Sequence, residues 1–412
     1  MSEAKFLPLE IVYQIVDILA DDPPTLCACA LTGKALVACV QTNLYKHIAP
    51  TFSHQSQQGA LLSRTLYSNP ALGTLVQSLK ISERLYREQP LLTPELLPFH
   101  LLSELRVLTL YLVELSGVDG IYGIISALPK LERLICDSLL DATSYDLPGP
   151  TNEATDPRSE SHPAQFPTLK ELAMKHGHWR HAELAERLLL HQPSAVASLE
   201  SLDVSFGCSG EALAWVPVVR AAGAHLRSLS LSMADQSPRL GQMPSHTISE
   251  QYASDHAYVL DNIAHCPSLQ SLCLKYNPDP FALVYIPRPH DLLNTLCDTL
   301  ERHPPPWPAL EALTLWAPDR DGQMSAVSPP LCERLAAVLL DTVRYPRFCR
   351  LTIRVGPQVW MSGLQMWSSL AGPGARVERG AVVERWCAAF TAFGRAPGVV
   401  LDVDTMHSPR AP

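Results

Sequence analysis

The chain has 412 residues, of which 47% are hydrophobic and 18% are charged, and its formal net charge is −9. This composition is typical of a globular protein with a large core, and the acidic balance argues against a nucleic-acid partner. No apolar run is long enough to cross a membrane, and the eleven scattered cysteines indicate a reducing compartment, either cytoplasm or nucleus.

Residues 7–48 are predicted to form three short apolar helices. Pro8 stands at the start of the first helix, where a missing N–H is harmless, and residues 21–24 end it. Thr25 is predicted to cap the second helix, which ends at Gly33, and residues 35–44 are predicted to form the third. About forty residues are too few to bury a core of their own, so this segment needs a partner surface.

Three groups of residues within this segment form an ordered sequence motif. They are Leu7-Pro8-x-Glu10-Ile11, then Ile15, Ile18 and Leu19, then Thr25-Leu26-x-x-Cys29-Ala30-Leu31. In this order they resemble the F-box family, although Asn43-Leu44-Tyr45 stands where many members carry a tryptophan.

The resemblance to the F-box implies a function without bond chemistry. Such a protein is the substrate-recognition subunit of a ubiquitin ligase: its helices dock on a Skp-type adaptor, and through that adaptor on a cullin. The residues expected to contact the adaptor are Leu7, Pro8, Leu9, Ile11, Ile15 and Leu19. The alternative is a protein-interaction scaffold in which the same helices only cap the following domain.

A short pattern, L-x-x-L-x-L or a near relative, recurs along the rest of the chain. It is found at residues 75–81, 105–110, 131–136, 169–174, 199–204, 226–231, 269–274, 310–315 and 348–353, and residues 399–403 resemble its final part. The L-x-L alternation predicts a strand with one buried face. Amphipathic helices are predicted between the copies at 181–192, 211–223, 255–266, 291–303, 331–345 and 381–393.

One strand and one helix per copy predict an α/β solenoid, because each unit buries its leucines only when a neighbour stacks on it. The pattern resembles the leucine-rich repeat, with about nine irregular units whose spacing varies from 26 residues (Leu108 to Leu134) to 43 residues (Leu229 to Leu272). A doubly wound α/β domain is the alternative. The predicted division is an F-box-like domain 1–48, a connecting segment 49–70, a solenoid 71–405 with a disordered loop at 143–167, and a tail 406–412.

The residues that alternate with the leucines are expected to face the concave surface of the solenoid. Large or charged side chains among them are typical of protein interfaces. The predicted target-binding residues are Tyr111, Lys175, Lys275, Trp316 and Arg354. The three cations would suit an acidic or phosphorylated segment of a target protein.

The sequence contains few candidates for catalysis or metal binding. His176, His178 and His181 lie close together, but a zinc site needs three or four ligands and no further cluster completes this one. No P-loop, dinucleotide fingerprint or nucleophile elbow is present. We therefore expect no cofactor, no metal and no enzymatic activity.

Overall fold

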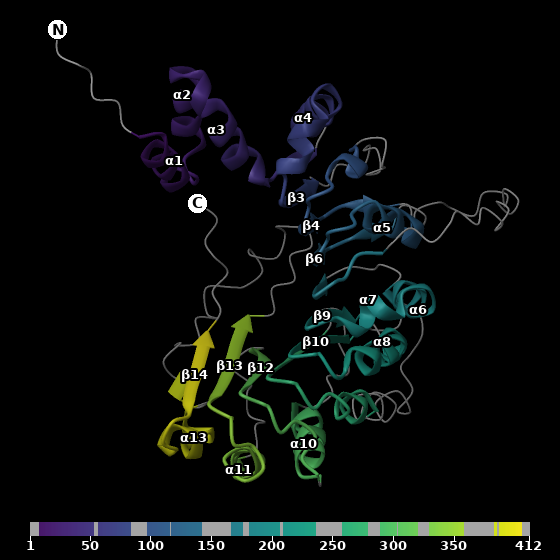
Figure 1. The fold of residues 1–412 in the computed structure, drawn as a ribbon. Coiled ribbons are helices and arrows are strands. Elements are labelled where there is room, and N and C mark those ends of the chain that lie inside the picture. Colours follow the sequence, from purple (N-terminus) through teal and green to yellow (C-terminus); the bar gives the residue numbers. More distant parts are fainter. Residues whose placement is uncertain are drawn as a thin grey trace, which may run out of the picture. The chain divides into compact units, whose positions relative to one another are not determined.

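In the computed structural model the chain forms two compact units, Met1–Leu169 and Lys170–Pro412 (Figure 1). The residues that the structure describes are 8–52, 57–83, 97–115, 117–141, 166–175, 181–206, 209–235, 258–278, 289–302, 304–319, 329–357, 383–384 and 387–405. Leu7, most of the predicted loop 143–167, and the predicted tail 406–412 lie outside these residues.

The first unit begins with the three predicted helices, α1 (Leu9–Ile18), α2 (Pro23–Thr32) and α3 (Lys34–Lys46). The predicted cap of α2 was wrong, because Asp22 and not Thr25 occupies the cap position. The carboxylate of Asp22 accepts hydrogen bonds from the amide of Thr25 at 3.2 Å and from its hydroxyl at 2.6 Å, and these bonds lower the pKa of Asp22. The two prolines that follow Asp22 fill the first helical positions, where no N–H is needed.

The chain enters a parallel sheet directly after α3, earlier than the repeat pattern predicted. Strands β1 (His47–Ile48) and β2 (Thr51–Phe52) both pair in parallel with β3 (Ser78–Glu83). Helix α4 (Gln58–Ser68) and the 3-10 helix η1 (Pro70–Leu75) connect β2 to β3. Two short strands therefore cover the edge of β3 before the first leucine copy begins.

The sheet of the first unit continues with β4 (Val107–Tyr111) and β6 (Arg133–Asp137), each parallel to the strand before it. The 3-10 helix η2 (Phe99–Leu101) precedes β4, and α5 (Gly117–Ser126) connects β4 to β6. Leu112 and Ser138 follow the ends of β4 and β6 and have positive φ values of 55° and 58°. These turns lead into β5 (Glu114–Leu115) and β7 (Leu140–Asp141), which pair with each other.

In the part of the second unit that the structure describes, seven parallel strands follow one another in chain order. They are β8 (Glu171–Lys175), β9 (Ser201–Phe206), β10 (Ser228–Asp235), β11 (Ser271–Pro278), β12 (Ala312–Asp319), β13 (Arg350–Pro357) and β14 (Val400–Thr405). All the predicted leucine copies are strands, including the weak ninth copy and the tenth strand. Strand order without reversal is unlike a doubly wound domain.

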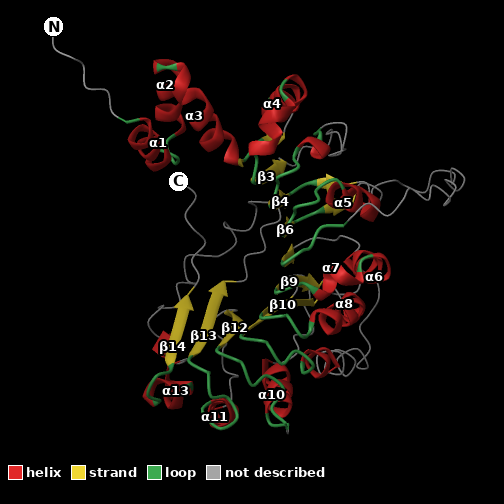
Figure 2. Ribbon diagram, in the orientation of Figure 1, coloured by secondary structure: helices red, strands yellow, loops and turns green. Residues whose placement is uncertain are grey.

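The helices of the second unit lie on one side of its strands (Figure 2). They are α6 (His181–His191), α7 (Pro193–Ala197), α8 (Ser209–Ala222), the helical residues 258–263, α10 (Pro289–Leu300), α11 (Pro329–Leu339) and α13 (Thr391–Arg395). Mixed α/β structure with an open parallel sheet fits a solenoid-like arrangement.

Two of the predicted helices depart most clearly from their expected course in the described residues. The helix predicted over 331–345 ends at Leu339, because the carboxylate of Asp341 accepts hydrogen bonds from the amides of Val343 and Arg344 and forms a turn there. The helix predicted over 381–393 is interrupted at Phe390, after which the short helix α13 begins.

The strand register aligns equivalent leucines of successive copies. In the second unit the row runs through Leu172, Leu202, Leu229, Leu272, Leu313, Leu351 and Leu401. From Leu172 to Leu351 these side chains are at most 1% exposed, and the partners two residues later, such as Val204 and Leu274, are also buried. The predicted direction of the L-x-L side chains is therefore confirmed.

Neighbouring copies are also joined by a repeated backbone contact. The carbonyl of the residue two positions before the aligned leucine accepts two amide N–H groups of the next copy. The carbonyl of Glu200, for example, accepts from Arg227 at 2.8 Å and from Ser228 at 3.0 Å, and the carbonyl of Arg227 accepts from Gln270 and Ser271. A carbonyl oxygen has two lone pairs, so both bonds can form at once.

Side chains from the following copy satisfy carbonyl groups at the ends of the helices. Trp307 donates its Nε1–H to the carbonyl of Ile263 at 2.9 Å, and Tyr345 donates its hydroxyl to the carbonyl of Leu300 at 2.9 Å. The last carbonyls of a helix have no partner within the helix, so these two bonds tie the helical residues 258–263 and the following helix, which ends at Leu300, to the next copy. Burial raises the pKa of the Tyr345 hydroxyl, which stays protonated as a donor.

Candidate functional site

Helix α1 has one apolar face turned inward and another turned to solvent. Val12, Val16 and Leu19 are buried or half-buried. The solvent-facing set is Ile11, Ile15 and Ile18, which are 41%, 43% and 81% exposed and are called the isoleucine stripe below. Their i, i+4, i+7 spacing places them on one side of the helix.

The interior of the helical segment is small. Val16, Leu26 and Val40 form its buried cluster, with one residue from each helix, and Leu19 packs partly against them. Asn43 also donates a hydrogen bond to the carboxylate of Asp17 at 2.9 Å, which joins α3 to α1. This interior holds the three helices together without using the isoleucine stripe.

The predicted adaptor residues therefore differ in their surroundings. Ile11 and Ile15 belong to the exposed stripe, whereas Leu19 lies partly inside the helical cluster. Pro8 and Leu9 are exposed at the start of α1, with Leu9 45% exposed. Leu7 lies outside the residues that the structure describes.

Sequence reasoning missed two of the most exposed apolar residues of this segment as contact residues. Ile18 is 81% exposed at the end of α1, and Leu31 is 90% exposed at the end of α2. Both belong to the motif positions that resemble the F-box, so their place in the motif could have suggested them. An exposed row of large apolar side chains on a small helical segment is typical of a protein interface.

Four of the five predicted target-binding residues lie in the second unit. Lys175 ends β8, while Lys275, Trp316 and Arg354 occupy one register row across β11, β12 and β13. The fifth residue, Tyr111, belongs to the first unit, where it ends β4 and is 39% exposed.

Trp316 lies between two cations in this row. The Nζ of Lys275 is 5.4 Å from the centre of the Trp316 ring, and the guanidinium carbon of Arg354 is 5.5 Å from it. Both distances are within the range of cation–π attraction. Because the leucines of the same strands face the helices, these three side chains lie on the opposite face of the sheet, called the strand face below.

Asp203 on β9 contacts both lysines of this face. Its carboxylate lies 3.3 Å from the Nζ of Lys275 and 3.4 Å from the Nζ of Lys175. The sequence placed Asp203 among the outward residues, but it did not indicate that one carboxylate would join two cations from different strands. The two lysines therefore share one counterion.

Arg354 has a different electrostatic environment from the lysines. Its register neighbour on β14 is Asp404, yet no ion pair with any described residue involves Arg354. Among the described side chains, the Nε atoms of Arg354 and Trp316 are also buried without a hydrogen-bond partner. Arg354 is therefore the cation of this row whose charge is not paired by a described residue.

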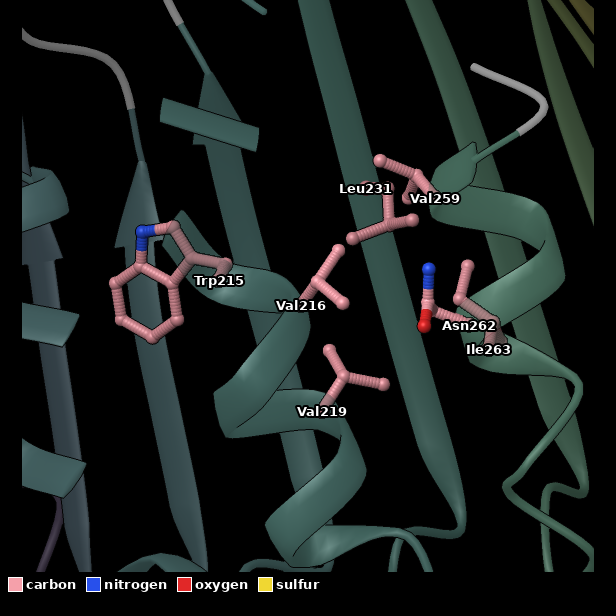
Figure 3. Close-up of a pocket in the computed structure, with 7 residues that line it drawn as sticks. All are labelled: Trp215, Val216, Val219, Leu231, Val259, Asn262 and Ile263. Carbon is pink, nitrogen blue, oxygen red and sulfur yellow. The ribbon is translucent and has the colours of Figure 1, made fainter. Parts of the chain in front are cut away.

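A small cavity lies on the other side of the second unit, between α8, the helical residues 258–263 and β10 (Figure 3). It is lined by Trp215, Val216, Val219, Leu231, Val259, Asn262 and Ile263. Its volume is about 10 Å³, close to the lower limit for one water molecule and far below that of a ligand pocket. The cavity is a packing gap between two copies and not a substrate site.

The described part of the chain contains no group of three or more His, Cys, Asp or Glu side chains placed to hold a metal ion. His176 and His178 of the predicted histidine cluster lie outside that part. Burial raises the pKa of the Cys266, Cys297 and Cys332 thiols to about 12, so these side chains stay protonated near neutral pH.

None of the helices that the structure describes combines the length and the apolar character needed to cross a membrane. The chain was also compared with known proteins: no protein-family model matches it, and no curated protein matches it significantly.

Proposed function

We propose that the chain is the substrate-recognition subunit of a Skp–cullin–F-box ubiquitin ligase. Helices α1–α3 would dock on a Skp-type adaptor, and the leucine-rich-repeat-like array would bind a target protein. The protein would act in the cytoplasm or nucleus without catalysing a reaction itself. By holding the target and the conjugating enzyme in one complex, it would raise their effective concentration for each other.

The observation that carries this proposal is the isoleucine stripe on α1. A helical segment that has its own buried cluster yet leaves Ile11, Ile15 and Ile18 in water has a surface suited to a partner protein. The stripe also coincides with the motif positions that resemble the F-box.

The second candidate function is a scaffold whose helical segment only caps the array. It is favoured by the course of the chain, since α3 leads directly into β1, and the amide of Gln77 donates to the carbonyl of Lys46 at the end of α3. However, β1 and β2 themselves cover the edge of β3. A cap of this kind needs α3 and the two short strands, but it does not need a solvent-facing apolar row on α1.

The experiment that separates the two functions replaces Ile11, Ile15 and Ile18 with serine and leaves the chain length unchanged. Deletion of residues 1–48 would be less informative, because it would also remove β1. The chain is co-expressed with a Skp-type adaptor, and complex formation is followed by size-exclusion chromatography with light scattering. A matched control is Leu61→Ser on α4, since Leu61 is 53% exposed in the same unit.

We expect a one-to-one complex with the wild-type chain and with Leu61→Ser. The triple serine variant should lose adaptor affinity by about tenfold or more for each isoleucine that the interface buries. Its thermal unfolding should stay close to wild type, because the stripe is already exposed. No wild-type complex, or full affinity in the triple variant, would overturn the proposal, and aggregation of that variant's array would favour the scaffold.

A further inference from the structure

In the register row of Lys275 and Trp316, Arg354 is a cation without an ion pair to any residue that the structure describes. Lys175 and Lys275 are held by Asp203, whereas Arg354 makes no ion pair with a described residue and only stacks on Trp316. We propose that Arg354, together with Trp316 and Lys275, binds an anionic side chain of a target protein segment, either a carboxylate or a phosphate. This inference rests on the proposed function in one respect only, that the bound segment belongs to a target of the ligase.

The cations of the site outnumber the carboxylates that pair with them among the described residues. The group formed by Lys175, Lys275, Arg354 and Asp203 contains three cations and one anion. Two further carboxylates, those of Asp402 and Asp404, lie on the neighbouring strand β14 in register with Thr352 and Arg354, but both are exposed. They make no ion pair with a described cation, so they leave the Arg354 guanidinium available to an incoming anion.

The site also contains hydrogen-bond donors that suit an anion. A guanidinium presents a planar fork of N–H groups that matches the two oxygens of a carboxylate or phosphate. Within the described part of the chain, the Nε of Arg354 and the Nε1 of Trp316 are both buried donors without an acceptor. A buried donor without an acceptor is unfavourable, so an oxygen that reaches these two groups gains more than it would on an ordinary surface.

Two side chains of the site are held in place, and the third is free to rotate toward a ligand. Lys275 is fixed by Asp203 on one side of the Trp316 ring, and the ring in turn lies against Arg354. The Arg354 side chain has no ion pair with a described residue to break, so it can rotate toward an anion while the lysine and the ring stay in place. Binding should therefore change the position of the guanidinium over the Trp316 ring.

The test uses that change as its readout. The full-length chain, which contains seven tryptophans, is labelled with 5-fluorotryptophan, and the Trp316→Phe variant identifies the fluorine resonance of Trp316. Three peptides of the same length are titrated: one with repeated glutamates, one with a single phosphoserine in a Ser/Gly background, and the neutral Ser/Gly peptide. The first two separate a carboxylate from a phosphate as the bound group.

We expect a saturable shift of the Trp316 resonance with at least one of the two anionic peptides and none with the neutral peptide. Arg354→Gln should weaken that affinity by about tenfold or more, and Arg354→Lys should retain part of it. Arg350→Gln is the matched control, because Arg350 is an exposed arginine on the same strand, and it should leave the affinity unchanged. Asp203→Asn should strengthen binding by about threefold, since it frees both lysines.

Opposite changes from Arg354→Gln and Asp203→Asn are not expected if these residues only support the fold. A wild-type resonance that shifts with neither anionic peptide overturns the inference. So does equal weakening by Arg350→Gln and Arg354→Gln, which would indicate a general effect of surface charge. The assay needs no adaptor, so a chain that binds the anionic peptide but not the adaptor would overturn the proposed ligase function while leaving the anion site standing.

Discussion

The helical segment α1–α3 and the strand–helix array of the second unit differ in how completely they bury their apolar side chains. The array buries its aligned leucines almost completely from Leu172 to Leu351, whereas Leu401 on β14, the last described strand, is only half-buried. The helical segment has one fully buried apolar residue from each helix and leaves Ile18 and Leu31 almost wholly in water. The array therefore buries its leucines through its own repetition, whereas the small interior of the helical segment leaves large apolar side chains of α1 and α2 in solvent.

The largest loss of stability is expected from a substitution in the buried leucine row of the array. Leu272 is fully buried in the aligned row, between Leu229 and Leu313 on the neighbouring strands. Leu272→Ala should lower the free energy of unfolding by about 3 kcal/mol, because it leaves a cavity in a tightly packed interior. Urea unfolding followed by circular dichroism measures the change.

Leu190→Ala on α6 is the matched control for this substitution, since Leu190 is 68% exposed. It should change the free energy of unfolding by less than about 0.5 kcal/mol. Equal losses in the two variants would mean that the buried leucine row does not dominate the stability of the array.

A smaller and more local effect is expected from Leu26→Ala in the helical segment. Leu26 is fully buried, so the substitution should weaken the packing of α1–α3 by about 2 kcal/mol. Because the cluster is small, hydrogen exchange should accelerate in residues 9–46 and stay unchanged in the second unit. Exchange that accelerates equally throughout both units would show that the helices and the array unfold as one.

The smallest change in stability is expected from a substitution in the exposed isoleucine stripe. Ile18→Ser changes a large apolar residue that contributes little to the interior, so the thermal unfolding midpoint of the free chain should hardly move. The same variant should lower adaptor affinity in the co-expression assay. A large drop in the midpoint without an adaptor would mean that Ile18 supports the fold and is not a free contact surface.

Much of the array could be predicted from the sequence because its signal is periodic. The L-x-L alternation identified every strand from β3 to β14 except the two-residue strands β5 and β7, and it predicted which side chains are buried. The strands β1 and β2 were missed because two residues are too short to produce an alternation. The end of α11 was missed because it depends on a turn formed by the Asp341 side chain.

The candidate sites could be predicted only in part. The sequence indicated that Lys275, Trp316 and Arg354 lie on one face, because they hold equivalent positions in successive copies. It did not indicate that Asp203 would pair with two lysines, since this depends on how long side chains extend across the sheet. Likewise, motif spacing identified α1, but only the packing of Val16 and Leu19 reveals which of its apolar residues remain in solvent.

The paired backbone hydrogen bonds between copies allow the segments that connect successive strands to differ in length. Each accepting carbonyl and its two donors lie just before a strand, so the contact between copies depends on a few residues at that point. The helix and loops that follow the strand take no part in it, and their length can change without altering how the next copy begins. Chain segments as different as the 26 residues from Leu108 to Leu134 and the 43 residues from Leu229 to Leu272 therefore begin their next strand with the same pair of backbone hydrogen bonds. Insertions between copies can lengthen the surface while these bonds stay the same.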